Sequence, residues 1–473
     1  MIVNDRSLRD DLATIRMAAV DAVLPRRLFT RRLAVVAGEL VLDNQPLTPP
    51  LVLGGRGRIA VVGGGKAAAG MAAGLGELLA GGGVAAARIT GLVSVPQGCG
   101  RPVAGVEVRE TRPAAANLPT PAAVAATREM LALVASLGPD DLVIALISGG
   151  GSALVAAPRA GIPLEEKIAV TTWLANAGAD ITQLNLVRRA ASDVKGGGLA
   201  RASTAGRMLV LVLSDVIGDP LRSIASGPCL PEAGDAAAAL AVLERFGAIA
   251  AGVAPRLVAL LRADVSRAAG TEQRPQITST GSWTTPRGCR VDHVLLGGNA
   301  EAVAAAATAA KQLGYCVTVR QAMAGCGETA DEVGRRLAHE GLALVAATVV
   351  DARARGIVEG GEAVVRLPRD HGIGGRNQQT VAAALAAVLG TPMSWPPGLA
   401  VASIGTDGED GPTAAAGGHA DAGVAAKITA LRLDAAAAVA GCDALPLLAA
   451  AGGLVVTGPT GTNVADVRIV LAR

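Results

Sequence analysis

Glycine-rich loops that carry a lysine, an arginine or a carboxylate are the parts of this sequence best suited to chemistry. The segment RDHGIGGRNQQT, residues 369–380, places Arg376 directly after glycines at the expected start of a helix. A guanidinium group can bind a planar oxyanion through two parallel hydrogen bonds. The amides of Asn377 and Gln378 lie beside it in the sequence. We therefore expect Arg376 to bind a carboxylate or phosphoryl group, with Asn377 contacting the same ligand.

A second cation lies in the glycine loop GGGKAAAG, residues 63–70. The loop fits the dinucleotide-binding pattern G-x-G-x-x-A, but the next predicted strand, Gly91–Pro96, ends without the acidic residue that would hold a ribose. The remaining prediction is an anion site formed by Lys66 and the N–H groups of Gly64 and Gly65 at a helix start. The glycines could instead only permit close packing of a strand against a helix.

A third loop, SGGGS, follows the apolar run Asp141–Ile147. Its hydroxyl and N–H groups could form a nest around phosphate oxygens. The two serines could alternatively cap a helix. The spacing is not the G-x-S-x-G of serine hydrolases, which sets nucleophilic serine catalysis aside. We expect the loop to contact nucleotide or substrate through Ser148, Gly149, Gly150, Gly151 and Ser152.

The stretch NLVRRAASDVKGGGLA, residues 185–200, carries two further cations. If it is helical, one quarter of its circumference carries four polar side chains, those of Asn185, Arg188, Ser192 and Lys195. Because the cations outnumber carboxylates on this face, an anion-binding face is favoured over an ordinary solvated one. Gly196 and Gly197, which follow, are expected to contact the same ligand.

Carboxylates follow two more apolar runs. Asp215 and Asp219 come after Met208–Leu213, and Asp407 comes after Leu399–Ile404. Magnesium takes one or two carboxylates together with water and phosphate oxygens. Aspartates in turns are also ordinary caps. Because phosphoryl transfer needs cations and metal carboxylates around the phosphoryl group, we expect these aspartates to hold Mg²⁺ or to orient the attacking hydroxyl, Asp215 foremost. Thr406 is expected to contact the ligand.

The elements that must position these loops alternate along the chain. Short Val/Ile/Leu runs, at 58–62, 141–147 and 208–213, each lead through a polar loop into an alanine-rich or helical stretch. This alternation predicts an α/β fold with a mainly parallel sheet, in which ligands bind at the carboxyl ends of the strands. Periodicity is lost between Arg262 and Arg290. We therefore predict an N-terminal domain at 1–262, a junction at 263–290 and a C-terminal α/β domain at 291–473.

Composition favours a small-molecule substrate. The chain has 473 residues, 43 Lys+Arg against 40 Asp+Glu, and only three Trp, two Phe and one Tyr. A nearly balanced charge and few aromatic residues argue against a nucleic-acid partner. The first 24 residues mix charges of both signs with apolar residues, and no run approaches the roughly 20 apolar residues of a membrane span. We expect a cytoplasmic protein without a membrane partner.

The order of the motifs resembles the glycerate 2-kinase family, whose carboxyl-terminal part is called the MOFRL domain. Some of its members carry the label hydroxypyruvate reductase. The motifs that carry the resemblance are GGGKAAAGMA, LISGGGSALV, NLVRR, KGGGLA, LSDVIGDP, GGNAEAV, GGEAVV, GGRNQQ, GTDGEDGPT and TGPTGTNVAD. The resemblance implies a Rossmann-like N-terminal domain with a doubly wound parallel sheet, a C-terminal MOFRL α/β domain, and an active site in a cleft between them.

The resemblance also implies phosphorylation of D-glycerate to 2-phosphoglycerate with ATP and Mg²⁺. Catalysis in the family is attributed chiefly to the lysine of the first glycine loop and the arginine of G-R-N-Q, which match Lys66 and Arg376. Three departures concern the substrate: the segment Glu110–Val124 lacks the family's G-H-P-x-P-D pattern, and Gln379 and Ala414 stand where acids are common.

Alternatives therefore stay open. The chain could phosphorylate a related hydroxy acid, reduce hydroxypyruvate with NAD(P)H, or bind a ligand without turnover. A homodimer is compatible with the sequence.

Overall fold

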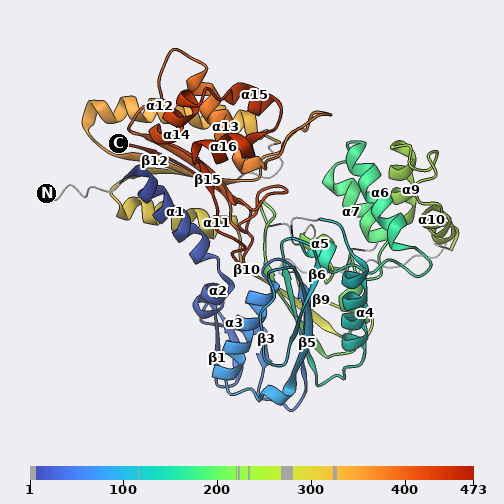
Figure 1. The fold of residues 1–473 in the computed structure, drawn as a ribbon. Helices are drawn as coiled ribbons and strands as arrows, with labels where there is room; N and C mark the ends of the chain where they lie inside the picture. The colour runs from blue at the N-terminus through green and yellow to red at the C-terminus, as the bar shows by residue number, and fades with distance from the viewer. Residues whose placement is uncertain are drawn as a thin grey trace. The chain divides into compact units, whose positions relative to one another are not determined.

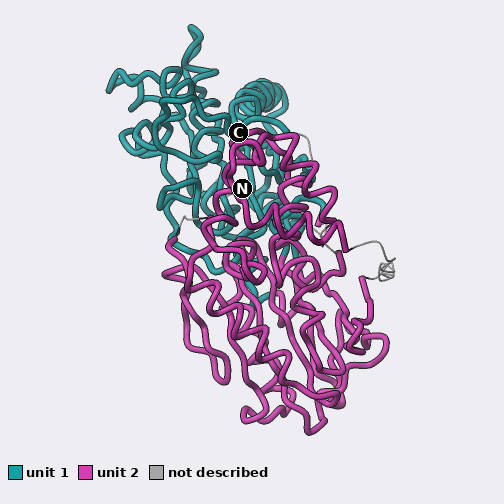
Figure 2. Tube along the Cα trace, turned by 90° about the vertical axis from the view of Figure 1, so that its right-hand side faces the viewer, with its two compact units in different colours: residues 1–27, 214–218, 297–473 teal, residues 28–213, 219–296 magenta. Residues whose placement is uncertain are grey.

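The computed structural model describes residues 7–114, 117–219, 221, 224–232, 235–267, 281–322 and 327–473. The chain forms two compact units, coloured separately in Figure 2. Unit 1 contains residues 1–27, 214–218 and 297–473, and unit 2 contains residues 28–213 and 219–296. Both units are discontinuous in sequence, so they differ from the continuous ranges predicted. The first helix joins the C-terminal part because it packs on a helix of that part. Residues 268–280 of the predicted junction lie outside the described residues.

Unit 2 is built on a seven-stranded sheet. The strand order is β6 (Glu107–Arg112), β5 (Ile89–Pro96), β4 (Ile59–Gly64), β7 (Leu142–Ser148), β8 (Arg207–Leu213), β10 (Arg290–Gly297) and β9 (Trp283–Thr284). The first five of these strands are parallel to their neighbours. In this sheet β4 comes first in the sequence, and β5 and β6 follow outward on one side of it. The chain then returns to the other side of β4, where β7 and β8 lie. This is the doubly wound order, with its switch point between β4 and β7.

The strands predicted from the apolar runs are confirmed. Every residue of β4 and β7 is buried, as expected for central parallel strands that are covered on both faces. Helices α3 (Ala68–Gly81) and α4 (Pro121–Ala135) pack on this sheet (Figure 1). The polar loops predicted after β4 and β7 therefore lie at adjacent carboxyl ends.

Two smaller assemblies complete unit 2. An antiparallel sheet is formed by β1 (Leu33–Val36), β2 (Glu39–Leu42) and β3 (Gln45–Val52), which follow α2 (Pro25–Arg32). Four helices share a separate apolar core that includes Leu174, Val187, Leu243 and Leu257. They are α6 (Leu164–Asn176), α7 (Ile181–Ala190), α9 (Ala236–Arg245) and α10 (Pro255–Arg267), grouped together in Figure 1. Short helices are α5 (Gly151–Leu154), α8 (Gly198–Ala202), η1 (Ala86–Arg88) and η2 (Ile224–Ser226).

Unit 1 holds a six-stranded sheet in the order β11 (Cys316–Arg320), β12 (Arg355–Gly361), β16 (Asp466–Ala472), β13 (Leu399–Gly405), β14 (Gly417–Ala420) and β15 (Leu454–Val455). The second α/β domain is present as predicted, but most neighbouring strands are antiparallel. The reason is that β16, the last strand, runs opposite to both β12 and β13 and lies between them.

Helices cover both faces of the unit 1 sheet. α1 (Leu8–Ala22) and α11 (Asn299–Gln312) pack together on one face, and Tyr315 just beyond α11 donates a 2.7 Å hydrogen bond to Asp11 of α1. On the other face lie α12 (Ala330–Asp351), α13 (Arg376–Leu389), α14 (Ala422–Ala430), α15 (Ala435–Ala440) and α16 (Ala444–Ala451) (Figure 1).

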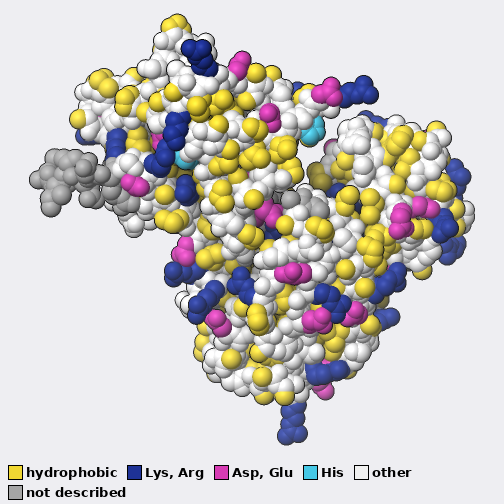
Figure 3. Space-filling model, in the orientation of Figure 1, with side chains coloured by type: hydrophobic (Ala, Val, Ile, Leu, Met, Phe, Trp, Pro, Cys, Tyr) yellow, Lys and Arg dark blue, Asp and Glu magenta, His cyan; other side chains and the backbone are white. Residues whose placement is uncertain are grey.

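The surface carries charges of both signs. On the face seen in Figure 3, the Lys and Arg side chains of the described residues lie among Asp and Glu side chains. Of the helices in the described ranges, none is long and apolar enough to cross a membrane.

Candidate active site

The loops after β4 and β7 are hydrogen-bonded to each other at the switch point. The Lys66 N–H donates to the carbonyl oxygen of Gly149 at 2.8 Å, and the Ala67 N–H donates to the hydroxyl oxygen of Ser148 at 3.1 Å. Gly65 permits this approach, because a Cβ there would lie 2.1 Å from the Ser148 hydroxyl oxygen and its φ is +145°. The backbone of Lys66 is therefore held where a doubly wound sheet binds its ligand.

The N–H groups of this first loop do not form the predicted anion site. The Gly65 N–H donates to Ser94 at 3.1 Å, and the Ala68 N–H donates to Gly65 at 3.2 Å. A Cβ at Gly64 would lie 2.8 Å from Val155 and 2.9 Å from the Ser94 carbonyl oxygen. Gly64 and Gly65 thus serve close packing, and an anion at this loop would be met by the Lys66 side chain.

The second loop keeps N–H groups available. Within the described part of the chain, no group accepts a hydrogen bond from the N–H of Gly149 or Gly150. Gly150 has a φ of +76°, and a Cβ there would lie 3.5 Å from the Lys66 side chain and 3.3 Å from the Arg112 guanidinium. Gly151 begins α5. The loop, Lys66 and Arg112 therefore form one group.

Sequence reasoning missed Arg112, which is 1% exposed at the end of β6. Its position at the carboxyl end of a parallel strand was the available signal.

The predicted helical face over residues 185–195 is wrong. α7 ends at Ala190, because the next residues pair with a distant segment: the Ser192 hydroxyl and the Asp193 N–H both donate to Ala157, at 3.0 and 2.9 Å. The N–H groups of Gly196 and Gly197 donate to Ser226 and Gly227 at 3.2 and 2.8 Å. These two glycines therefore bond the neighbouring backbone instead of presenting their N–H groups to a ligand.

Three side chains that the sequence predicted as ligand contacts nevertheless line one cavity of about 40 Å³, namely Ser152, Arg188 and Lys195. The Lys195 ammonium donates to the Ser152 hydroxyl at 3.0 Å and to the Ala225 carbonyl at 3.1 Å, and Arg188 lies on the same wall. Asn185 accepts a 2.9 Å hydrogen bond from Ser226, outside the cavity lining. The segment Asn117–Pro119, within the stretch that departs from the family pattern, also lines the cavity.

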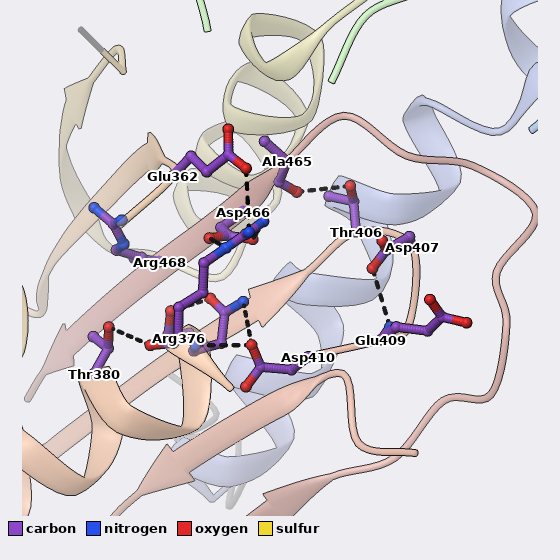
Figure 4. Close-up of polar contacts among 12 residues, drawn as sticks. Glu362, Arg376, Thr380, Thr406, Asp407, Glu409, Asp410, Ala465, Asp466 and Arg468 are labelled. Atoms are coloured by element: carbon purple, nitrogen blue, oxygen red, sulfur yellow. Dashed lines mark hydrogen bonds and ion pairs between the residues drawn. The ribbon is translucent and has the colours of Figure 1, made fainter. Parts of the chain in front are cut away.

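In unit 1, Arg376 is the first residue of α13, as the glycines before it predicted. Asp410 caps this helix by accepting hydrogen bonds from the N–H groups of Asn377 and Gln378, at 3.0 and 2.8 Å. Figure 4 shows the guanidinium of Arg376 between the carboxylates of Asp466 and Glu362. Two hydrogen bonds, of 2.6 and 2.9 Å, join it to Asp466, and Glu362 lies at 3.1 Å. The bidentate partner of Arg376 is thus a protein carboxylate.

This clamp fixes the charge state of Arg376. Burial acts to lower the pKa of Arg376, but the charge and hydrogen bonds of Asp466 and the charge of Glu362 raise it above its usual value. The guanidinium is therefore a permanent cation. Asp466 was missed in the sequence because it follows a loop of small polar residues and meets Arg376 across 90 positions of the chain.

Two predicted ligand contacts of unit 1 are buried structural groups. The amide of Asn377, 2% exposed, donates to Asp410 at 3.2 Å and accepts from Ser403 at 2.5 Å. The Thr406 hydroxyl, fully buried, donates to Ala465 at 2.7 Å and accepts from the Val464 N–H at 2.8 Å. Their hydrogen-bonding groups are used to position Asp410 and the loop before β16.

Two of the aspartates predicted to bind a metal lie in unit 1, and the loop before β16 bonds to the side chain of one and to the main chain of the other. Asn463 donates to Asp215 at 3.3 Å, and the Thr460 N–H donates to the Asp407 carbonyl oxygen at 3.1 Å. Asp219 belongs to unit 2, where it has a φ of +52°. Within the described ranges, no three His, Cys, Asp or Glu residues are grouped so as to hold a metal ion. The oxygen donors of Asp215 and Asp407 suit Mg²⁺, which completes its shell with water and phosphate.

Comparison with known proteins places the chain in a family. Residues 11–262 match the model of a domain of unknown function, DUF4147, and residues 355–466 match the MOFRL family. A protein named glycerate kinase from Homo sapiens is 34% identical over 526 residues, covering 100% of this chain and 94% of its own length. The chain belongs to the glycerate kinase family.

A further family relative, from Agrobacterium vitis, is named putative hydroxypyruvate reductase and is 34% identical, covering 100% of this chain and 96% of that protein. The crystal structure of a glycerate kinase from Thermotoga maritima matches with a TM-score of 0.74 at 30% identity, covering 98% of this chain and 99% of that one. The resemblance drawn from the motifs and the two-domain α/β fold are therefore both confirmed.

Proposed function

We propose that this protein is a kinase that transfers the terminal phosphoryl group of ATP to the 2-hydroxyl of D-glycerate, giving 2-phosphoglycerate and ADP. The observation that carries the proposal is the full-length similarity to a relative named glycerate kinase. In the reaction, a bond forms between the 2-hydroxyl oxygen and phosphorus, the bond to the ADP oxygen breaks, and the hydroxyl proton is released.

Unit 2 would bind anionic oxygens. Lys66 would neutralise charge on the transferring phosphoryl group, and the N–H groups of Gly149 and Gly150 would donate to phosphate oxygens. The hydrogen bond from the Lys66 N–H to Gly149 supports these two roles, because it holds the Lys66 backbone against the loop. The Ser148 hydroxyl helps to hold the two loops together, because it accepts a hydrogen bond from the Ala67 N–H.

Unit 1 would supply a metal and a second cation. Asp215 and Asp407 are the oxygen donors that would hold Mg²⁺, which when bound neutralises phosphate charge. Arg376 would contribute a guanidinium whose direction is set by Asp466 and Glu362. Asp215 could alternatively orient the attacking hydroxyl.

The test is an assay with purified protein, Mg-ATP and D-glycerate that follows ADP release and identifies the phosphorylated product. We expect 2-phosphoglycerate, and a fall in kcat/KM of at least about 100-fold in Lys66→Ala and in Arg376→Ala, since each removes a charge that stabilises the transition state. Lys311→Ala, at an exposed position of α11, is the matched control and should keep full activity. Formation of 3-phosphoglycerate, or full activity in both variants, would contradict the proposal.

The reductase alternative is tested in the same preparation. A relative named putative hydroxypyruvate reductase favours keeping it, whereas the absence of a ribose-binding acid after Gly91–Pro96 in the sequence disfavours it. Oxidation of NADH or NADPH that depends on hydroxypyruvate would establish it. If neither reaction occurs, a panel of other hydroxy acids tests for a related substrate, and ligand binding without turnover would indicate a sensor. A cytoplasmic location and a homodimer stay predictions.

A further inference from the structure

The cavity beside Ser152 is lined by a basic residue that was not predicted from the sequence to bind a ligand. Lys167 of α6 lines it together with Arg188 of α7 and Lys195 of the following segment. Lys167 is 4% exposed, and its ammonium has no hydrogen-bond acceptor among the residues described. An amine buried in this way is costly unless something compensates it. A bound anion would compensate it.

The electrostatic surroundings also point to an anion. Across the described ranges, no carboxylate lies within 4 Å of the charged groups of Lys167, Arg188 or Lys195. Burial lowers the pKa of Lys167 to about 7, with Arg188 adding to the effect and Asp193 opposing it. Burial, Lys167 and Arg188 likewise lower the pKa of Lys195. Three basic side chains line one cavity. Asp193, which favours the charged form of Lys167 without forming an ion pair with it, can balance only one of their charges. The cavity therefore suits an oxyanion.

The size and lining of the cavity select a small organic acid. One water needs about 10–15 Å³ of such volume, so about 40 Å³ admits a group of a few atoms. The lining also includes apolar Leu118, Pro119 and Ile168, and the hydroxyl of Ser152. Apolar walls suit a carbon chain, and a hydroxyl suits an alcohol.

Resting on the proposed function, we propose that this cavity binds the carboxylate of the hydroxy acid substrate, and that Lys167 is a binding residue that sets the affinity for it. Arg188 and Lys195 hold the same carboxylate. Lys66 and the Gly149–Gly151 loop remain for the phosphoryl group.

The first experiment compares KM values in Lys167→Met, which keeps the length of the side chain and removes its charge. We expect the KM for D-glycerate to rise about tenfold or more, the loss typical of one charged hydrogen bond, with the KM for ATP changed less than twofold. Lys167→Arg should recover part of the affinity. Lys311→Met, at an exposed helix position, is the matched control and should leave both values unchanged. A rise in the KM for ATP alone would assign the cavity to phosphate and overturn the proposal.

A second measurement does not depend on turnover. Binding of D-glycerate without ATP is followed by calorimetry at pH 7.5 in buffers of different ionisation enthalpy. A carboxylate favours the charged form of Lys167, whose neighbours are Arg188, Asp193 and Lys195, so binding should take up protons and weaken as the pH rises above 7. Lys167→Met should reduce the uptake. Binding with neither uptake nor pH dependence would contradict the proposal even if the protein is an active kinase. Lys167-dependent binding without ADP release would instead contradict only the proposed function.

Discussion

Asp466→Asn tests whether the clamp on Arg376 stabilises unit 1. Asp466 is fully buried and makes two hydrogen bonds to the guanidinium. The substitution keeps the shape of the side chain but removes its charge and one acceptor. Breaking a buried ion pair costs about 3–5 kcal/mol. Because the Arg376 side chain is 34% exposed and Glu362 remains 3.1 Å away, solvent and the second carboxylate compensate part of the loss. We expect a loss of about 2 kcal/mol in the free energy of unfolding.

The assay must report on unit 1 alone. Trp395 belongs to unit 1, is 4% exposed and donates a 2.9 Å hydrogen bond to Leu399, whereas the other two tryptophans, Trp173 and Trp283, belong to unit 2. In a background with Trp173→Phe and Trp283→Phe, urea unfolding followed by fluorescence reports on Trp395.

The matched control is Glu362→Gln. It removes a carboxylate from the same guanidinium, but the Glu362 side chain is 46% exposed. Exposed pairs contribute about 0–1 kcal/mol, so the control should unfold close to the parent protein. If Asp466→Asn costs no more than Glu362→Gln, the clamp does not stabilise the unit and the reasoning is refuted.

Two further predictions concern packing and protonation. Gly65→Ala should destabilise unit 2 by about 2 kcal/mol or more, because its Cβ would overlap Ser148 and its φ is +145°. Gly76→Ala in α3, with no atom within 4 Å, should stabilise unit 2 by about 0.5–1 kcal/mol. Both are measured by urea unfolding in a Trp395→Phe background, in which the fluorescence of Trp173 and Trp283 reports on unit 2. The pKa of His419 is lowered to about 4 by burial and by the charge of Arg9, so its contribution to stability is present above the unfolded pKa of about 6.5 and is lost as the pH falls toward 4, by up to about 3 kcal/mol. His419→Leu should flatten that pH dependence, and an unchanged profile would show that His419 is not its source.

Local pattern was sufficient to predict the sheet of unit 2. β4, β7 and β8 are uninterrupted apolar runs, and central parallel strands are the structures that bury such runs on both faces. The start of α13 could be predicted for a similar reason, since the glycines before Arg376 end the preceding loop. Both features depend on residues that are neighbours in the chain.

Features that depend on distant residues could not be predicted. α7 stops at Ala190 because Ser192 and Asp193 bond to Ala157, about 35 positions earlier. Lys167 follows two glutamates in an ordinary helical sequence, and only packing in the tertiary structure buries it. The pairing of Arg376 with Asp466 could likewise not be predicted from the sequence, because 90 positions separate the two residues. The helical periodicity drawn over 185–195 was therefore a valid local pattern that tertiary hydrogen bonds overrode.

The two candidate sites have opposite net charge, and this difference bears on how Arg376 could act. Two carboxylates, Asp466 and Glu362, contact its single guanidinium, so this group as a whole is negative and by itself repels a phosphate. The candidate site residues of unit 2 are mostly basic, and they include Lys66, Lys167, Arg188 and Lys195. Anionic oxygens of a nucleotide or an acid therefore suit unit 2, whereas unit 1 suits a metal cation. Arg376 can stabilise a phosphoryl group only when a cation compensates the two carboxylates, so its contribution to catalysis should depend on Mg²⁺ in a way that the contribution of Lys66 does not.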